Sequence, residues 1–310
     1  MSEPVAAPEV LLRVRDEDRA AIEAQLAAVG LSGTLQPARE AAPALGIIDP
    51  EVLGGDLAGR LQLAAEHYPQ TPILLLSGSR ERTTLAGLVE VPTVAAIIAR
   101  DTAERAHELA VALGILRGGP RFGLANLIGS APALLSRELA ASHDRDPVIE
   151  ELEAQLTQNG IRPRMARLAC DAVEELVTNA IYDAPTDASG DRIYATTDRR
   201  ESIVLAETAR PRLEVAVVGT RVVALMSDPH GSLDVLTVRR YLAQGLRGDV
   251  SDKPGGAGLG LARIYGLVDR LVVQIAPRRR TEIAFMLEAG AVKRDPAQRP
   301  TGLVAWSSND

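Results

Sequence analysis

Lysine is nearly absent from this 310-residue chain, since only Lys253 and Lys293 of its 34 basic residues are lysines. Chemistry that requires a lysine before residue 253 is therefore excluded. Cysteine occurs once, as Cys170, so no internal disulfide can form and a reducing, cytoplasmic setting is expected. Cys170 falls in an apolar helical pattern, which indicates a core thiol rather than a reactive nucleophile.

Long apolar runs are also missing. No stretch approaches the roughly 18 apolar residues of a membrane span, and residues 1–10 lack the charged-then-apolar pattern of a signal peptide. The net charge of −7 argues against a general nucleic-acid binder, which needs clustered basic charge to neutralise phosphates. The length predicts two domains, because domains commonly run to roughly 100–200 residues.

The first 118 residues alternate between short apolar runs and helical patterns. Four strands are expected, at 10–14, 45–48, 72–76 and 94–98. Three helices are expected between and after them, at 18–29, 57–67 and 102–113. This alternation predicts a first domain over residues 1–118 with a doubly wound parallel α/β sheet and helices on both faces.

The remainder of the chain has a different pattern. Residues 119–160 form a predicted connecting segment with helices at 131–141 and 147–158. Residues 161–290 form a predicted α+β domain, and residues 291–310 a polar tail that contains Trp306. The α+β domain is expected to contain a helix from 165 to about 183, a hairpin of strands at 212–218 and 221–227, a helix to about 269, and strands at 271–276 and 282–287.

Three polar residues mark the predicted helix that runs to residue 183. Glu175, Asn179 and Asp183 are spaced four apart, so they share one helix face. Opposite them lie Ala169, Ala172, Val173, Leu176 and Ala180. An amphipathic helix with a solvated face has the same pattern, so the spacing alone does not decide between structure and function.

Two further features follow along the chain. Asp228 ends a predicted buried strand, where it could accept a hydrogen bond from an exocyclic amine or could simply stabilise the turn at Pro229. A glycine cluster, residues 255–260, then opens a helix, so that backbone amides and the helix dipole can face phosphate oxygens. The cluster is not a P-loop, because no lysine followed by serine or threonine accompanies it.

The order and spacing of these pieces resemble the GHKL superfamily, which includes gyrase, the large heat-shock chaperone and histidine kinases. Glu175-x-x-x-Asn179, then Asp228 after a hairpin, then Gly256-x-Gly258-Leu259-Gly260-Leu261 match the motifs of that family over roughly residues 130–290. Thr281, before a late strand, resembles its last conserved threonine. The resemblance implies a two-layer Bergerat ATP-binding sandwich.

The resemblance also implies roles for these residues. Asn179 would be a ligand of Mg²⁺, Glu175 a general base or the group that orients the attacking hydroxyl, and Asp228 the acceptor for the adenine amino group. Residues 231–254 would form a lid over ATP. The implied ATP-binding set is Asn179, Asp183, Asp228, Gly231, Gly256, Gly258, Leu259, Gly260, Leu261 and Thr281.

One departure from the motifs of the family bears on ATP hydrolysis. The first glycine box of the family usually reads Asp-x-Gly-x-Gly, whereas residues 228–232 here read Asp-Pro-His-Gly-Ser, with the single glycine at Gly231 displaced. ATP binding is therefore better supported than hydrolysis.

The N-terminal third is similar to the receiver domain of two-component signalling. Asp49 ends a predicted central strand, where receivers carry the phospho-acceptor, and Ser77 closes the next strand. Asp16 matches one acid of the magnesium-binding pair, but Arg15 replaces the other. No lysine is available, and Arg100 is only a partial substitute because a guanidinium is a planar fork. A pseudo-receiver used for docking is favoured over a phosphorylated switch.

Two functions therefore remain open. A cytoplasmic signalling kinase or ATPase, similar to the serine kinases that control sigma factors, would act on or sequester another signalling protein. A non-catalytic module would use ATP only to change its docking. A DNA machine of the gyrase type would need a further transducer domain, and neither nucleic acid nor a membrane is an expected partner. A homodimer is compatible with either function.

Overall fold

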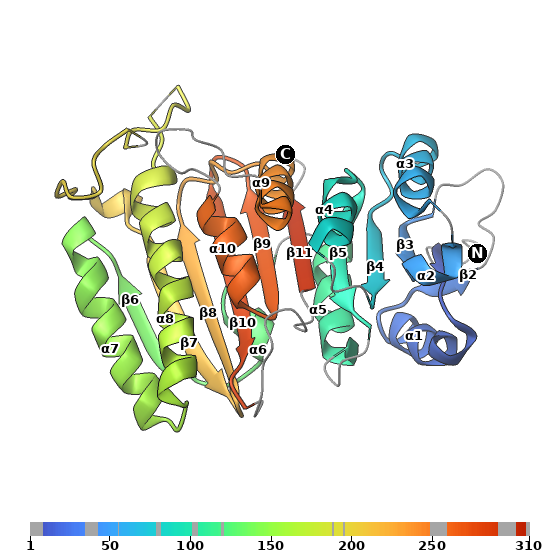
Figure 1. Ribbon diagram of the computed structural model, residues 1–310, viewed down its shortest axis with the longest axis horizontal. Helices are drawn as coiled ribbons and strands as arrows, with labels where there is room; N and C mark the ends of the chain where they lie inside the picture. The colour runs from blue at the N-terminus through green and yellow to red at the C-terminus, as the bar shows by residue number, and fades with distance from the viewer. Residues whose placement is uncertain are drawn as a thin grey trace, which may run out of the picture.

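The computed structural model describes residues 9–34, 43–54, 56–78, 82–100, 105–118, 121–187, 189–194, 196–248, 259–290 and 302–307. Their strands form one mixed sheet in the order β2-β1-β3-β4-β5-β11-β9-β10-β8-β7-β6 (Figure 1). The strands are β1 (Glu9–Arg13), β2 (Ser32–Thr34), β3 (Leu45–Ile48), β4 (Ile73–Ser77), β5 (Val94–Ala99), β6 (Leu135–Glu138), β7 (Arg212–Val218), β8 (Arg221–Asp228), β9 (Arg270–Ala276), β10 (Arg280–Glu288) and β11 (Gly302–Ser307).

Strand direction changes at β11. Strands β1 to β5 are parallel, and neighbours from β9 through β10, β8 and β7 to β6 are antiparallel. β11 pairs antiparallel with β5 through Leu303–Ile97 and Val304–Ala96. On its other side it pairs parallel with β9 from Gly302 to Ser307. The last described strand of the chain thus joins the two halves of the sheet.

The predicted fold class, a receiver-like parallel sheet plus a separate Bergerat sandwich, is therefore wrong. The sequence analysis placed residues 302–307 in a polar tail, yet Leu303, Val304 and Ala305 are buried in β11. Without this strand, β5 and β9 would each present a row of unpaired backbone groups. Because β11 satisfies both edges, the sheet continues as one layer.

The helices cover the sheet from both sides. They are α1 (Asp16–Ala28), α2 (Pro50–Leu53), α3 (Leu57–His67), α4 (Arg82–Glu90), α5 (Arg105–Gly118), α6 (Ala125–Ile128), α7 (Arg145–Gln158), α8 (Pro163–Thr178), α9 (Val235–Arg247) and α10 (Leu259–Leu267). One core contains residues of α3, α4 and α7 to α10, whereas the other contains residues of α1, α5 and α6. Both cores contain side chains of β5, β11 and β9, so each extends across the junction.

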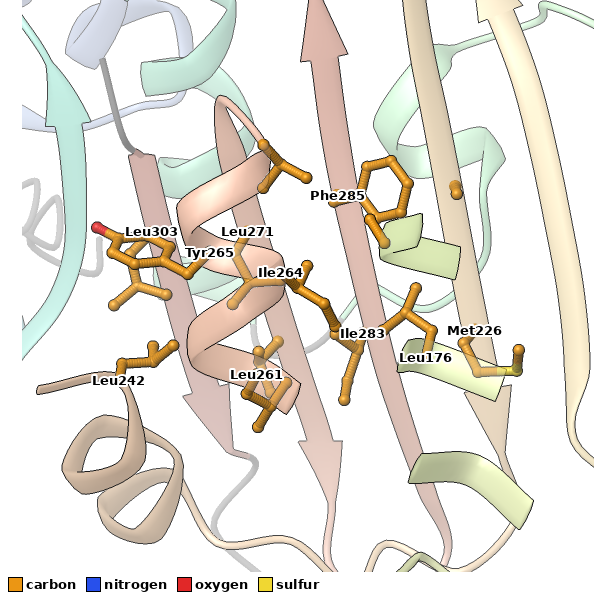
Figure 2. Packing of buried hydrophobic residues seen from close by; sticks show 14 of the residues in the cluster. Leu176, Met226, Leu242, Leu261, Ile264, Tyr265, Leu271, Ile283, Phe285 and Leu303 are labelled. Carbon is orange, nitrogen blue, oxygen red and sulfur yellow. The ribbon is translucent and has the colours of Figure 1, made fainter. Parts of the chain in front are cut away.

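The first core is closely packed around α10. Figure 2 shows Leu261, Ile264 and Tyr265 of this helix between Leu242 of α9 and Leu176 of α8. On the sheet, these helices pack on apolar side chains of four strands: Leu271, Ile283, Phe285, Met226 and Leu303. Side by side over the antiparallel strands, α7, α8, α10 and α9 form the layer that holds the candidate site (Figure 1).

Several local predictions also need correction. The helix expected at 131–141 is wrong: residues 135–138 form β6, an edge strand held by its pairing with β7 despite the helix propensity of its alanines and leucines. Strand β2 and helix α4 were not predicted. Much of the expected lid is α9, whose buried Val238, Leu242 and Ala243 pack in the core.

Within the described ranges, no helix has the length and apolar character needed to cross a membrane. Cys170 is buried on α8, where desolvation raises the pKa of its thiol to about 12. A thiol that stays protonated is a poor nucleophile, in line with the core role expected from the sequence.

Candidate functional site

A pocket with an empty volume of about 540 Å³ opens where α8, β8, β10, α9 and α10 meet. Its polar lining includes Asn179, Asp183 and Asp228, three of the residues singled out from the sequence. The remaining walls are Leu176, Ala180, Ala184, Arg192, Met226, Leu233, Tyr241, Leu261 and Ile283. A concave, largely apolar site with a few convergent polar groups is typical of small-molecule binding.

Helix α8 positions the first polar groups. It begins with Pro163 in its first turn and buries a continuous apolar face against the sheet. The α-helix ends at Thr178, and residues Asn179–Asp183 continue as a π-helical turn. Such turns are rare and are frequent at functional sites. The wider turn changes the stacking expected for Asp183, although both Asn179 and Asp183 still line the pocket.

Glu175 and Asn179 lie against the first turn of α10. A Cβ atom added at Gly260 would lie 2.8 Å from Glu175 Oε2 and 3.2 Å from Asn179 Nδ2, so only glycine fits without a shift. Arg263, one turn along α10, donates to Glu175 Oε1 at 2.5 Å. Glu175 lies beside the pocket, and an ion pair occupies one of its carboxylate oxygens.

Asp183 is held by Arg199, which lies in the polar segment 185–200, whose composition predicts a loop. Arg199 donates to both of its carboxylate oxygens at 3.1 and 3.2 Å, and the guanidinium carbon lies 4.4 Å from the centre of the Tyr182 ring. This arrangement fixes Asp183 at the pocket rim and neutralises much of its charge.

Asp228 ends β8 with only 6% of its surface exposed. Its Oδ1 accepts a hydrogen bond of 2.9 Å from the backbone amide of His230. Desolvation raises the pKa of Asp228 above its ordinary value near 3.8, although the His230 amide opposes the rise. A buried carboxyl with an uncompensated burial cost is a common feature of ligand sites.

Thr281 of β10 lies directly beside Asp228 of β8, because the two residues are partners in the antiparallel β10–β8 ladder. Its hydroxyl is fully buried, favours the charged form of Asp228, and makes no hydrogen bond of normal geometry within the described residues. Buried polar atoms are usually hydrogen-bonded. The Asp228–Thr281 pair thus has hydrogen-bonding capacity that the described part of the chain does not use fully.

Gly231 fixes the chain as it leaves β8. Its φ of +58° lies in the left-handed region, and an added Cβ would lie 2.2 Å from the carbonyl oxygen of Ala276. The displaced glycine of the motif therefore has a structural role, since it lets residues 228–233 pass close to the turn after β9.

Gly231→Ala is expected to cost at least about 2 kcal/mol of unfolding free energy, because the methyl group adds a backbone collision to the strained φ. Gly219→Ala is the matched control: φ there is +62°, but a Cβ would meet nothing within 4 Å. Urea unfolding of both variants measures the difference. An equal loss of unfolding free energy in both variants would show that the close contact with Ala276 does not add to the cost of the substitution.

The glycine cluster is only partly visible. Gly256 and Gly258 lie outside the described residues, whereas Leu259 begins α10 and Leu261 is buried in the pocket wall. Gly260, in the first turn of α10, lies against Asn179. The partial positive charge of this helix terminus would favour an anion there. Lys253, which the sequence placed near the end of the lid, also lies outside the described ranges.

No cluster of three or more His, Cys, Asp or Glu residues is placed to hold a metal ion within the described residues. The donor set at the pocket, an amide oxygen and carboxylates, fits Mg²⁺, which keeps several waters and commonly takes phosphate oxygens as ligands. Asn179 and Asp183 are the side chains there that could hold such an ion.

The sequence analysis missed the arginines around the pocket. Arg192 lines it, Arg199 holds Asp183 and Arg263 holds Glu175. Arg192 and Arg199 come from a segment whose composition predicted only a loop, and no spacing rule connects a loop residue to a helix face. Tyr241 and Leu233 were missed because their segment was assigned to a lid.

The predicted phospho-acceptor lies far from this pocket along the sheet. Asp49 is buried at the end of β3, and its Oδ2 forms ion pairs with Arg15 Nε at 3.2 Å and Arg100 Nη1 at 3.1 Å. The Asp16 side chain is 99% exposed and pairs with Arg19 instead. Two guanidinium groups thus lie beside Asp49, and the docking role favoured for this part of the chain stays a prediction.

Comparison with known proteins adds no identification. No model of a known protein family matches the sequence, and no curated protein matches it significantly.

Proposed function

We propose that the pocket between α8, β8, α9 and α10 binds ATP with Mg²⁺. One observation supports this most strongly: motif residues that are far apart in the sequence, Asn179, Asp228 and Leu261, line one pocket, and Thr281 pairs with Asp228 in the β10–β8 ladder. This is the arrangement implied by the resemblance of those motifs to GHKL proteins. The function follows from the site residues and does not require a separate sandwich domain.

The floor of the pocket is suited to adenine. Asp228 lines the pocket, and its carboxylate is the polar group there that can accept a hydrogen bond from the base. A carboxylate accepts hydrogen bonds, so it favours the exocyclic amine of adenine over the carbonyl that guanine carries at that position. Met226, Ile283 and Leu261 provide apolar surfaces for the ring.

The opposite end of the pocket is suited to phosphates. Asn179 can offer its amide oxygen to Mg²⁺, and the first turn of α10 lies against it at Gly260. The N-terminal amides of a helix and its dipole stabilise phosphate oxygens. Asp183 would orient a water of the Mg²⁺ shell while Arg199 limits its negative charge.

Glu175 decides between the two functional alternatives. As a free carboxylate beside the phosphates it could accept a proton from an attacking hydroxyl or water, as a protein kinase or ATPase requires. Its ion pair with Arg263 instead favours the second candidate, a non-catalytic module that uses ATP to change how it docks to a signalling partner. Phosphate release and partner phosphorylation assays distinguish them.

Calorimetric titration with ATP, with and without Mg²⁺, tests the site. The wild type should bind in a Mg²⁺-dependent manner, and Asn179→Ala should weaken Mg-ATP binding by roughly tenfold or more, since one metal ligand and its orientation are lost. Asn159→Ala, at the exposed end of α7, removes the same group away from the pocket and should bind as the wild type. A wild type that binds no adenine nucleotide would refute the proposal.

A further inference from the structure

A second cavity lies on the same side of the protein as α9 but beside the junction strand β11. Its empty volume is about 710 Å³. Four chain segments meet there: the stretch before β4, the start of β5, the first turns of α9 and the end of β11. Its lining residues are Pro69, Gln70, Thr71, Pro72, Pro92, Thr93, Ala95, Val235, Leu236, Arg239, Ala305, Trp306 and Ser307.

Arg239 is the unusual member of this lining. Only 4% of its surface is exposed, and its Nη1 donates to the backbone carbonyls of Val91, at 3.1 Å, and Pro92. Its Nε is buried and has no partner, and within the described ranges no carboxylate pairs with the guanidinium. Burial lowers the pKa of Arg239 to about 10. A buried cation without an anion is costly, and a bound anion would remove that cost.

Thr93, another residue of the lining, also carries an unsatisfied donor. Its Oγ1 is buried and makes no hydrogen bond within the described residues. The guanidinium can only donate, and the hydroxyl can donate as well. Such donors favour an acceptor as the ligand, and the planar guanidinium matches the two oxygens of a carboxylate. Trp306 is also part of the lining, but it packs against the core that contains α1, α5 and α6.

The rest of the lining is mixed. Pro69, Pro72, Pro92, Val235 and Ala305 are apolar, whereas Gln70, Thr71 and Ser307 are polar. An inorganic anion gains nothing from the apolar part, whereas an organic acid buries its hydrocarbon part against it. Leu236, with 59% of its surface exposed, lies at the rim.

We propose that this cavity binds a small organic carboxylate, with its charged group on Arg239 and Thr93 and its apolar body against the prolines. The site is distinct from the ATP pocket and does not depend on it. Both sites share α9, however, because Tyr241 lines the ATP pocket and Arg239 lines this one.

Trp306 is the only tryptophan of the chain and belongs to the lining, so its fluorescence is a local probe of this cavity. Titration with hexanoate should give a saturable change in tryptophan emission. Arg239→Met should weaken hexanoate binding about tenfold or more, because the charged partner is lost while an unbranched apolar stem is kept. Arg240→Met, the exposed neighbour on α9, changes the net charge equally and should leave binding unchanged.

If Arg239→Met fails to fold, Thr93→Val tests the same site with a smaller change. Thr93→Val should weaken hexanoate binding several-fold. Phosphate, titrated in parallel, should bind more weakly than hexanoate. Equal hexanoate binding by Arg239→Met and the wild type would overturn the proposal, as would phosphate binding as tight as that of hexanoate.

Discussion

Val304→Asp should abolish cooperative folding of the whole chain. Val304 has 2% of its surface exposed and lies in the middle of β11, paired with Ala96 of β5 and with Val272 of β9. A carboxylate there has no cationic partner in the strand ladder, and burying it costs several kcal/mol. Because native proteins are stable by about 5–15 kcal/mol, this loss is expected to leave the variant largely unfolded or aggregated.

Circular dichroism during thermal and urea unfolding measures the effect. Val204→Asp is the matched control, since Val204 is 71% exposed and the same substitution there should change stability little. A single lost transition for Val304→Asp would show that both halves of the sheet depend on β11. If the variant instead kept one native-like transition, the two halves would fold independently, as the predicted two-domain organisation requires.

β11 also shows why local sequence patterns could not predict the whole fold. Its apolar run, Leu303 to Trp306, is short and is flanked by polar residues on both sides, so its composition resembles that of a tail. The strand exists because β5 and β9 need a partner, which is a long-range requirement that local patterns do not contain. Strongly periodic segments were easier: the helix predicted at 57–67 is confirmed by α3 with the same bounds.

The candidate site, like the fold, was only partly predictable from the sequence. Glu175 and Asn179 share a helix face by spacing alone, and Asp228 ends a strand that the apolar pattern predicts. The π-helical turn after Thr178 could not be predicted, because it adds one residue per turn with no distinctive sequence. Nor could the ion pair of Arg263 with Glu175, since it forms only when α10 packs on α8.

Asp228→Asn should separate stability from function at the ATP pocket. The carboxylate is proposed to accept from adenine, and an asparagine amide in its place can present a donor to the same amine. Loss of a hydrogen bond to a charged group costs about 1.5–3 kcal/mol, so ATP binding should weaken roughly 10- to 150-fold. Asp234→Asn, at the exposed N-cap of α9, makes the same charge change outside the pocket and should bind ATP as the wild type.

The same Asp228→Asn substitution should not destabilise the fold, although it weakens ATP binding. Since burial raises the pKa of Asp228, the folded protein binds its proton more tightly than the unfolded chain does. The free energy of unfolding therefore falls as the pH rises from about 4 through the folded pKa. Asp228→Asn removes this titration, while the amide oxygen can still accept from His230.

The Asp228→Asn variant should therefore be at least as stable as the wild type at pH 7, and its advantage should shrink toward pH 4. Thermal unfolding across this range, beside ATP titration at pH 7, measures both effects on one protein. A variant that loses stability and keeps ATP binding would mean that Asp228 is a structural cap of the β8 turn. A variant that gains stability and loses ATP would show that the buried charge is maintained for the ligand, because the fold alone is better without it.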